Sequence, residues 1–163
     1  MPCTLRPALP ADVPLILQLI RELAEYEKML DQVVATETLI EQALFGRNPK
    51  AQVILAEVGT ASAGFALSFP TFSTFLARPG RYLEDLYVRP PYRGLGIGKA
   101  LIAELARATI DQGGRRLEWS VLNWNQPAID FYQRLGARPQ GDWTVYRLGD
   151  RALTELAAPA PPK

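Results

Sequence analysis

The feature that most constrains this chain is a glycine-rich loop between an apolar run and a long helical pattern. Arg93, Gly96 and Gly98 follow the strand-like residues 83–88 and precede a helical pattern over 97–112. Glycines at a strand-to-helix junction let the backbone approach an anion, and the positive end of the helix faces the same place. We therefore predict a phosphate-binding loop, to which Arg93 adds a fixed charge.

Two better-known phosphate loops do not match these residues. A Walker A loop would need glycine at position 93 and serine or threonine at position 100, which hold Arg93 and Ala100. A dinucleotide-binding fingerprint would need glycine at position 99 or 101, which hold Lys99 and Leu101. The spacing that remains is R-x-x-G-x-G, with a plain glycine-rich turn before a helix as the alternative.

The composition is that of an ordinary globular domain. The 163 residues are 48% hydrophobic and 21% charged, which suits one domain with a real core. The net charge of +1 is spread along the chain without a basic block, so neither nucleic acid nor a membrane surface is expected as a partner. No apolar run is long enough to cross a membrane and no leader pattern opens the chain, so we predict a cytoplasmic protein.

The sequence contains no histidine and one cysteine, Cys3. An internal disulfide is therefore impossible and a metal site is not expected. Acid–base chemistry must use glutamate, aspartate, tyrosine, lysine or water.

Strand and helix patterns alternate along the chain, which predicts an α/β fold. A single domain is predicted over 1–156, followed by a loose tail rich in proline and alanine over 157–163. Asp12, Thr36 and Asn125 are predicted helix N-caps. The predicted strands are 4–6, 52–58, 62–69, 81–89, 117–122 and 143–148. Helices are predicted over 97–112 and 126–135, after Asp12 with Leu15, Leu19, Leu23 and Tyr26 on one face, and after Thr36 with Leu39, Ile40, Ala43 and Leu44, ending at 46–50.

Beyond the loop, three segments match one known family. The segment 118–137 has a strand followed by Asn125 and a helix bearing Ala-Ile-x-Phe-Tyr, and it resembles the GCN5-related N-acetyltransferases together with the R-x-x-G-x-G loop. The segments 82–88 and 23–27 resemble the diamine (spermidine/spermine) acetyltransferase branch and its bacterial relatives. The resemblance implies a mixed, mostly antiparallel central sheet with helices on both faces, acetyl-CoA as cofactor and a homodimer.

The resemblance also implies which residues hold the cofactor. The loop would bind the pyrophosphate, while backbone groups of the preceding strand would pair with the pantetheine arm as a missing strand would. The implied cofactor residues are Leu86, Tyr87, Val88, Arg93, Gly94, Leu95, Gly96, Ile97, Gly98, Lys99, Asn125, Pro127, Ala128 and Tyr132.

Acetyl transfer to an amine needs a group that accepts the amine proton and one that protonates the thiolate. The resemblance gives the first role to Glu84, through water, and the second to Tyr132. Alternatively, Glu84 is a solvated strand carboxylate and Phe131 and Tyr132 are core aromatics. The neighbouring Asp85 is the other candidate base, because a strand bulge would change which of the two carboxylates faces the cleft.

The amine itself is expected to meet acidic and aromatic side chains. The candidate substrate residues are Tyr26, Glu27, Glu84, Asp85, Glu118 and Trp119. They suit a primary amine of a small diamine, polyamine or lysine-like amino acid, acetylated directly rather than through Cys3. The alternative is a non-catalytic acyl-CoA-binding or sensor module.

Overall fold

The computed structural model describes residues 3–159, which form two units divided after Leu122. The first unit contains β1 (Cys3–Pro7), α1 (Val13–Tyr26), α2 (Glu37–Phe45), β2 (Gln52–Val58), β3 (Ala61–Ser73), β4 (Arg78–Val88), α3 (Ile97–Asp111) and β5 (Leu117–Glu118). Short 3-10 turns η1, η2 and η3 lie at Pro10–Asp12, Leu30–Gln32 and Pro90–Tyr92. The second unit contains α4 (Gln126–Arg134) and α5 (Asp150–Ala157). The single domain over 1–156 stays a prediction.

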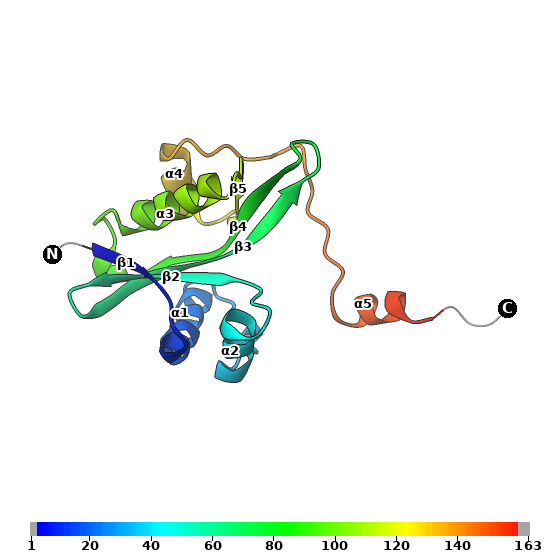
Figure 1. The fold of residues 1–163 in the computed structure, drawn as a ribbon, viewed down its shortest axis with the longest axis horizontal. Coiled ribbons are helices and arrows are strands. Elements are labelled where there is room, and N and C mark those ends of the chain that lie inside the picture. The colour runs from blue at the N-terminus through cyan, green and yellow to red at the C-terminus, as the bar shows by residue number, and fades with distance from the viewer. Residues whose placement is uncertain (1–2, 160–163) are drawn as a thin grey trace. The chain divides into compact units, whose positions relative to one another are not determined.

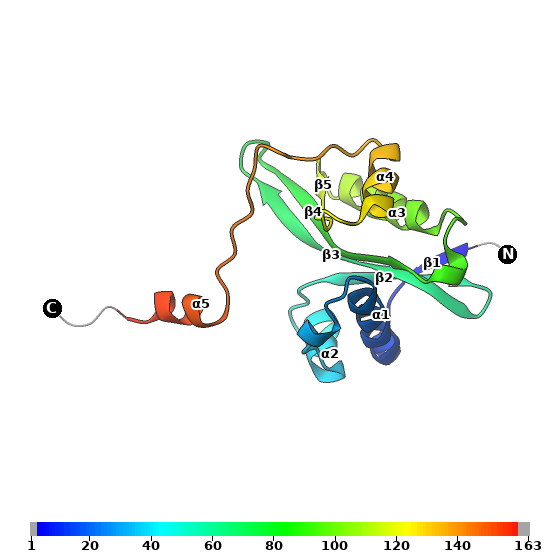
Figure 2. The same ribbon diagram turned by 180° about the vertical axis from the view of Figure 1, so that it is seen from behind.

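The first unit is one sheet covered by helices on both faces. Its strands follow the order β1-β2-β3-β4-β5, with antiparallel pairing up to β4 and parallel pairing between β4 and β5. Helices α1 and α2 lie on one face and α3 lies on the other (Figures 1 and 2). This is the predicted mixed, mostly antiparallel sheet.

Each face carries its own apolar layer, because strand residues alternate between the two faces. On the α1–α2 face, Leu55 and Phe65 pack in one cluster with Ile16 and Leu19 of α1. On the other face, α3 buries one stripe of residues spaced three or four positions apart, which is the period of an amphipathic helix. The stripe consists of Ile97, Leu101, Ile102 and Leu105.

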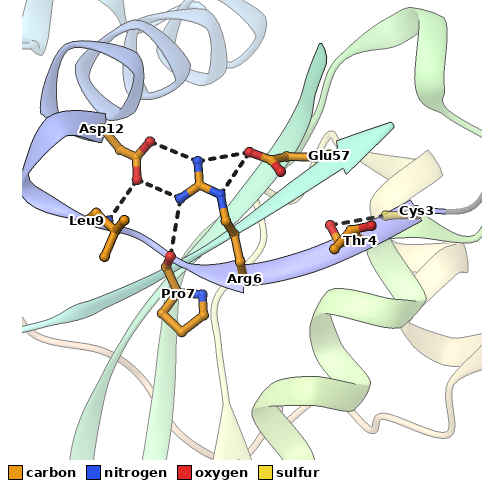
Figure 3. A network of polar contacts seen from close by, with 7 residues as sticks. All are labelled: Cys3, Thr4, Arg6, Pro7, Leu9, Asp12 and Glu57. Atoms are coloured by element: carbon orange, nitrogen blue, oxygen red, sulfur yellow. Dashed lines mark hydrogen bonds and ion pairs between the residues drawn. The ribbon is translucent and has the colours of Figure 1, made fainter. Parts of the chain in front are cut away.

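An ion-pair network fastens β1 to its surroundings (Figure 3). Arg6 donates to both carboxylate oxygens of Asp12 at 2.7 and 2.9 Å and to Glu57 of β2 at 2.9 Å. The hydrogen bonds from Arg6 hold the pKa of the Asp12 carboxyl below its usual value. Asp12 precedes α1 as predicted, but its carboxylate accepts from the Leu9 backbone N–H and from the Arg6 guanidinium instead of capping the helix. The predicted side-chain caps at Thr36 and Asn125 are confirmed, at 3.3 Å to Leu39 N and 3.4 Å to Ala128 N.

The chain after α3 differs most from prediction. Strand β5 covers two residues where 117–122 was predicted. The strand predicted over 143–148 is wrong, because these residues pair with no strand within the described range 3–159. Instead α5 forms over Asp150–Ala157. The predicted tail 157–163 starts at the last residue of α5, and its residues 160–163 lie outside the described residues. None of the helices within 3–159 combines the length and the apolar character needed to cross a membrane.

Candidate active site

The predicted phosphate loop joins the end of β4 to the start of α3. Gly94 and Gly96 have φ angles of 78° and 79°, a left-handed conformation that side chains other than glycine adopt at a cost. Gly96 is the N-cap of α3 and supplies no side-chain cap, so N–H groups of the first helical turn stay available to an anion. Within the described part of the chain, a Cβ atom at Gly94 or Gly96 would meet no atom within 4 Å beyond those of its own and adjacent residues. The backbone on this side is therefore accessible.

Arg93 is held beside the loop by the strand and two aromatic rings. Its Nε donates to the Val88 carbonyl at 2.9 Å. The guanidinium carbon lies 4.9 Å from the ring centre of Tyr26 and 5.8 Å from that of Tyr87, within cation–π range. Arg93, the candidate phosphate-binding side chain, thus also contacts Tyr26, a candidate substrate residue at the end of α1.

One edge of β4 is open next to the loop. Strand β5 pairs with β4 only at Arg81 and Tyr82, and within residues 3–122 no strand continues that pairing along 83–88. Backbone groups of Leu86 and Val88, which the family resemblance assigns to the cofactor, lie in this stretch. The Tyr87 side chain is buried in the α1–α2 core, so only its backbone can face a ligand at this edge.

A β-bulge separates the two candidate carboxylates of β4. Leu67 of β3 faces Asp85, while the next residue, Ser68, faces Leu83, so Glu84 has no partner across the ladder. After the bulge, Asp85 shares the α1–α2 face with Tyr87, two positions on. The sequence could not locate this bulge.

The carboxylate of Asp85 is affected by two other carboxylates, those of Glu84 and Glu27. Burial, together with the negative charges of Glu84 and Glu27, raises the pKa of Asp85 to about 6. Burial also raises the pKa of Glu27, which follows α1. A group of like charges with a partly buried member favours a cationic ligand. We call Glu27, Glu84 and Asp85 the acidic cluster.

The remaining candidate substrate residues lie on or beside β5. Glu118 accepts from Arg116 Nε at 2.8 Å, so its charge is partly compensated. Trp119 is half-buried. The Tyr82 and Ser120 hydroxyl oxygens lie 2.7 Å apart and join β4 to the segment after β5.

The other predicted residues belong to the second unit, which is described by itself. Asn125 caps α4, and Pro127 and Ala128 lie in its first turn. Tyr132 lies on the same helix with its ring centre 5.3 Å from that of Phe131. The structure thus brings the loop, the β4 edge and the acidic cluster together in the first unit, and the capping and acid candidates together in the second.

Comparison with known proteins identifies the family. The model of the acetyltransferase (GNAT) family matches residues 16–137, from α1 through α4. The chain belongs to this family. Its activity is N-acetyl transfer, as the resemblance of its motifs predicted.

The chain is similar to curated acetyltransferases and shares its fold with a solved structure. A thialysine N-epsilon-acetyltransferase from Sus scrofa is 39% identical over 94% of this chain and 96% of its own length. The L-ornithine N5-acetyltransferase NATA1 of Arabidopsis thaliana is 31% identical over 93% of this chain and 86% of its own. An integron cassette protein from the mobile metagenome of V. cholerae has a TM-score of 0.81 at 25% identity, covering 96% and 98% of the two chains.

Proposed function

We propose that this acetyltransferase uses acetyl-CoA to acetylate a primary amine of a small diamine, polyamine or lysine-like amino acid by direct transfer. The observation that carries the proposal is the acidic cluster on and beside the strand that leads into the phosphate loop. A cationic amine would be drawn to these carboxylates. The relatives named for thialysine and L-ornithine support an amino acid carrying a side-chain amine.

The residues present fit coenzyme A. The left-handed glycines and the uncapped start of α3 suit a pyrophosphate, and the open edge of β4 suits an arm that carries amides. When bound, acetyl-CoA supplies the activated acetyl group. Backbone groups of Leu86 and Val88 would orient that arm, and Arg93 would add positive charge beside the loop.

Glu84 is proposed to accept the proton of the amine through water. An alkyl ammonium near neutral pH must lose a proton before it can attack a carbonyl. Glu84 is exposed at the bulge, where water can reach it, and Asp85 and Glu27 hold negative charge nearby. Asp85 is the competing base, since its raised pKa of about 6 suits proton transfer near neutrality.

Tyr132 is proposed as the acid that protonates the departing thiolate. A phenol remains protonated at neutral pH and can donate its hydrogen. The family resemblance of the helix around Tyr132 supports this role.

A homodimer is proposed for the whole chain. Large apolar side chains are exposed along 143–156, with Trp143 at 76% and Tyr146 at 92% exposure. Such residues gathered on one segment favour an interface with another chain. Size-exclusion chromatography with light scattering tests this, and a monomer at every concentration would contradict it.

The activity is tested by measuring free thiol release from acetyl-CoA against a panel of amines. Lysine, thialysine, ornithine, putrescine and spermidine would form the panel, with a matched panel of carboxylic acids lacking the side-chain amine as control. Amine-dependent thiol release supports the proposal. Binding of acetyl-CoA by calorimetry without release for any amine would support the alternative, a non-catalytic acyl-CoA-binding module.

A further inference from the structure

The other face of β4 carries a buried arginine that the proposed mechanism does not use. Arg81 is 2% exposed, and its hydrogen bond to Gln112, the C-cap of α3, places its guanidinium on the α3 side of the sheet. Its Nη1 donates to Gln52 Oε1 of β2 at 3.0 Å and to Ser68 Oγ of β3 at 3.1 Å, and its Nη2 donates to Gln112 Oε1 at 3.1 Å. One guanidinium thus joins two neighbouring strands and the end of α3 to β4.

Arg81 has no acidic partner among residues 3–122. Its acceptors are two amides and one hydroxyl, its Nε is buried without a hydrogen-bond partner, and burial lowers its pKa. A buried charge without a counter-charge is expensive, so this side chain contributes less to stability than a paired one would. Its hydrogen bonds instead fix the relative positions of β2, β3, β4 and the end of α3.

The geometry that Arg81 specifies is that of the bulge. Ser68 is the residue at which the register between β3 and β4 shifts. On its other side, Ser68 pairs with Gln52 of β2. Arg81 lies three positions before the bulged Glu84 on β4. Its hydrogen bond to Ser68 therefore holds the β3 residue at which the register shifts.

The position of the bulge decides which carboxylate faces α1. Regular alternation from Tyr82, which faces Phe69 on the α1–α2 side, would place Glu84 on that side and Asp85 on the α3 side. The bulge reverses this and places Asp85 beside Glu27. A shift of one residue would thus exchange the two carboxylates.

We propose that Arg81 is a positioning residue that fixes the bulge at Glu84 and so determines which carboxylates meet the amine. This inference rests on the proposed function, because it assumes that the acidic cluster binds the amine. It assigns to Arg81 no contact with the substrate.

The main test is Arg81→Met, which keeps an unbranched apolar stem and removes the guanidinium donors. We expect kcat/KM for the best amine to fall by about tenfold or more and its pH profile to move, because misplacing a reacting group is costly. The Kd for coenzyme A should stay within about twofold, because the phosphate loop lies at the far end of β4.

The matched control is Arg6→Met, which removes a comparable set of hydrogen bonds from β1 (Figure 3). It should lower the melting temperature and leave kcat/KM and the pH profile unchanged. Wild-type kinetics in Arg81→Met, or equal kinetic losses in Arg6→Met, would overturn the proposal. If Arg81→Met does not fold, Ser68→Ala decides: a smaller change in the same direction supports the proposal, and wild-type kinetics overturn it.

A readout independent of turnover separates this inference from the proposed function. Carboxyl NMR titration should show Asp85 of the wild type titrating near pH 6, and in Arg81→Met or Ser68→Ala its pKa should move toward the ordinary value. An unmoved Asp85 titration would overturn the inference. If no amine gives thiol release but the pKa of Asp85 still changes in Arg81→Met, the proposed function is rejected and the positioning role of Arg81 is supported.

Discussion

The site along β4 uses backbone groups at one end, near Val88, and side-chain carboxylates at the other, around Glu84. At the end near Val88, the site consists of backbone: glycines with left-handed φ angles, the first turn of α3 and an open strand edge. Around Glu84, it consists of side-chain carboxylates whose directions depend on a bulge. The backbone end follows from a local motif, whereas the side-chain end follows from how two strands pair. Cofactor binding should therefore depend on few positions, and amine selection on many.

The largest effect is expected at the backbone end, from Gly96→Val. A β-branched residue at a φ of 79° is strained and would also place a side chain where the pyrophosphate approaches. The Kd for coenzyme A should rise by about a hundredfold or more, as measured by calorimetry. Gly59→Val, at a φ of 64° in the β2–β3 turn, is the control and should lower stability without changing affinity. Unchanged binding in Gly96→Val would remove the basis of the cofactor assignment.

The second largest effect is expected from Tyr132→Phe, which tests whether a side chain of α4 acts as the proton donor. Removing one hydroxyl should lower kcat by about a hundredfold while the fold and coenzyme A affinity survive, the scale expected for a positioned proton donor. Phe131→Leu is the neighbouring control and should change stability more than rate. Equal losses of stability and rate in Tyr132→Phe would support a core aromatic instead.

The acidic cluster is compared directly by Glu84→Gln and Asp85→Asn. Glu84→Gln should lower turnover by about tenfold near neutral pH and recover in part at high pH, where neutral amine is already present. Asp85→Asn should lack that recovery. The reverse pattern, with recovery only in Asp85→Asn, would make Asp85 the base.

Asp85→Asn should also change stability in a pH-dependent way. The folded pKa of about 6 exceeds the ordinary value of 3.8, so the folded state favours the protonated carboxyl. That contribution is present below about pH 4 and is lost as the pH rises through about 6. The neutral amide keeps it, so the melting temperature of Asp85→Asn should exceed that of the wild type by about 5 °C at pH 8 and match it at pH 3. A wild-type melting temperature at pH 8 would show that Asp85 is not buried as described.

The smallest effect is expected from the ion pair that fastens the loop side of β4 to α1. Arg89 donates to both oxygens of Glu22, at 2.8 and 2.7 Å, and these bonds lower the pKa of Glu22. Its stabilisation is therefore present above about pH 4.5 and is lost as the pH falls further. Glu22→Gln should cost about 1 kcal/mol at pH 7 and little at pH 2, measured by chemical denaturation. Glu104→Gln, in an exposed pair on α3, should cost less at both pH values.

The sequence predicted the strand, the glycine-rich loop and the helix of the backbone end, because the signals for these elements are local. Gly94 and Gly96 mark left-handed backbone directly, and the apolar stripe of α3 has the helical period. The bulge at Glu84 has no such signal, since it exists only relative to β3. The segment 143–148 failed for a similar reason: its apolar residues suit a strand, but a strand needs a partner. Arg81 in a strand pattern gave no indication that it would be buried.

The open edge of β4 along 83–88 has a consequence for handling the protein. An unpaired strand edge is a template on which another polypeptide can add a strand, and this is a common route to aggregation. A ligand lying along that edge would block the template. We therefore expect the protein without coenzyme A to precipitate at a lower concentration, and sooner in storage, than the protein with coenzyme A. Added coenzyme A should then improve its solubility.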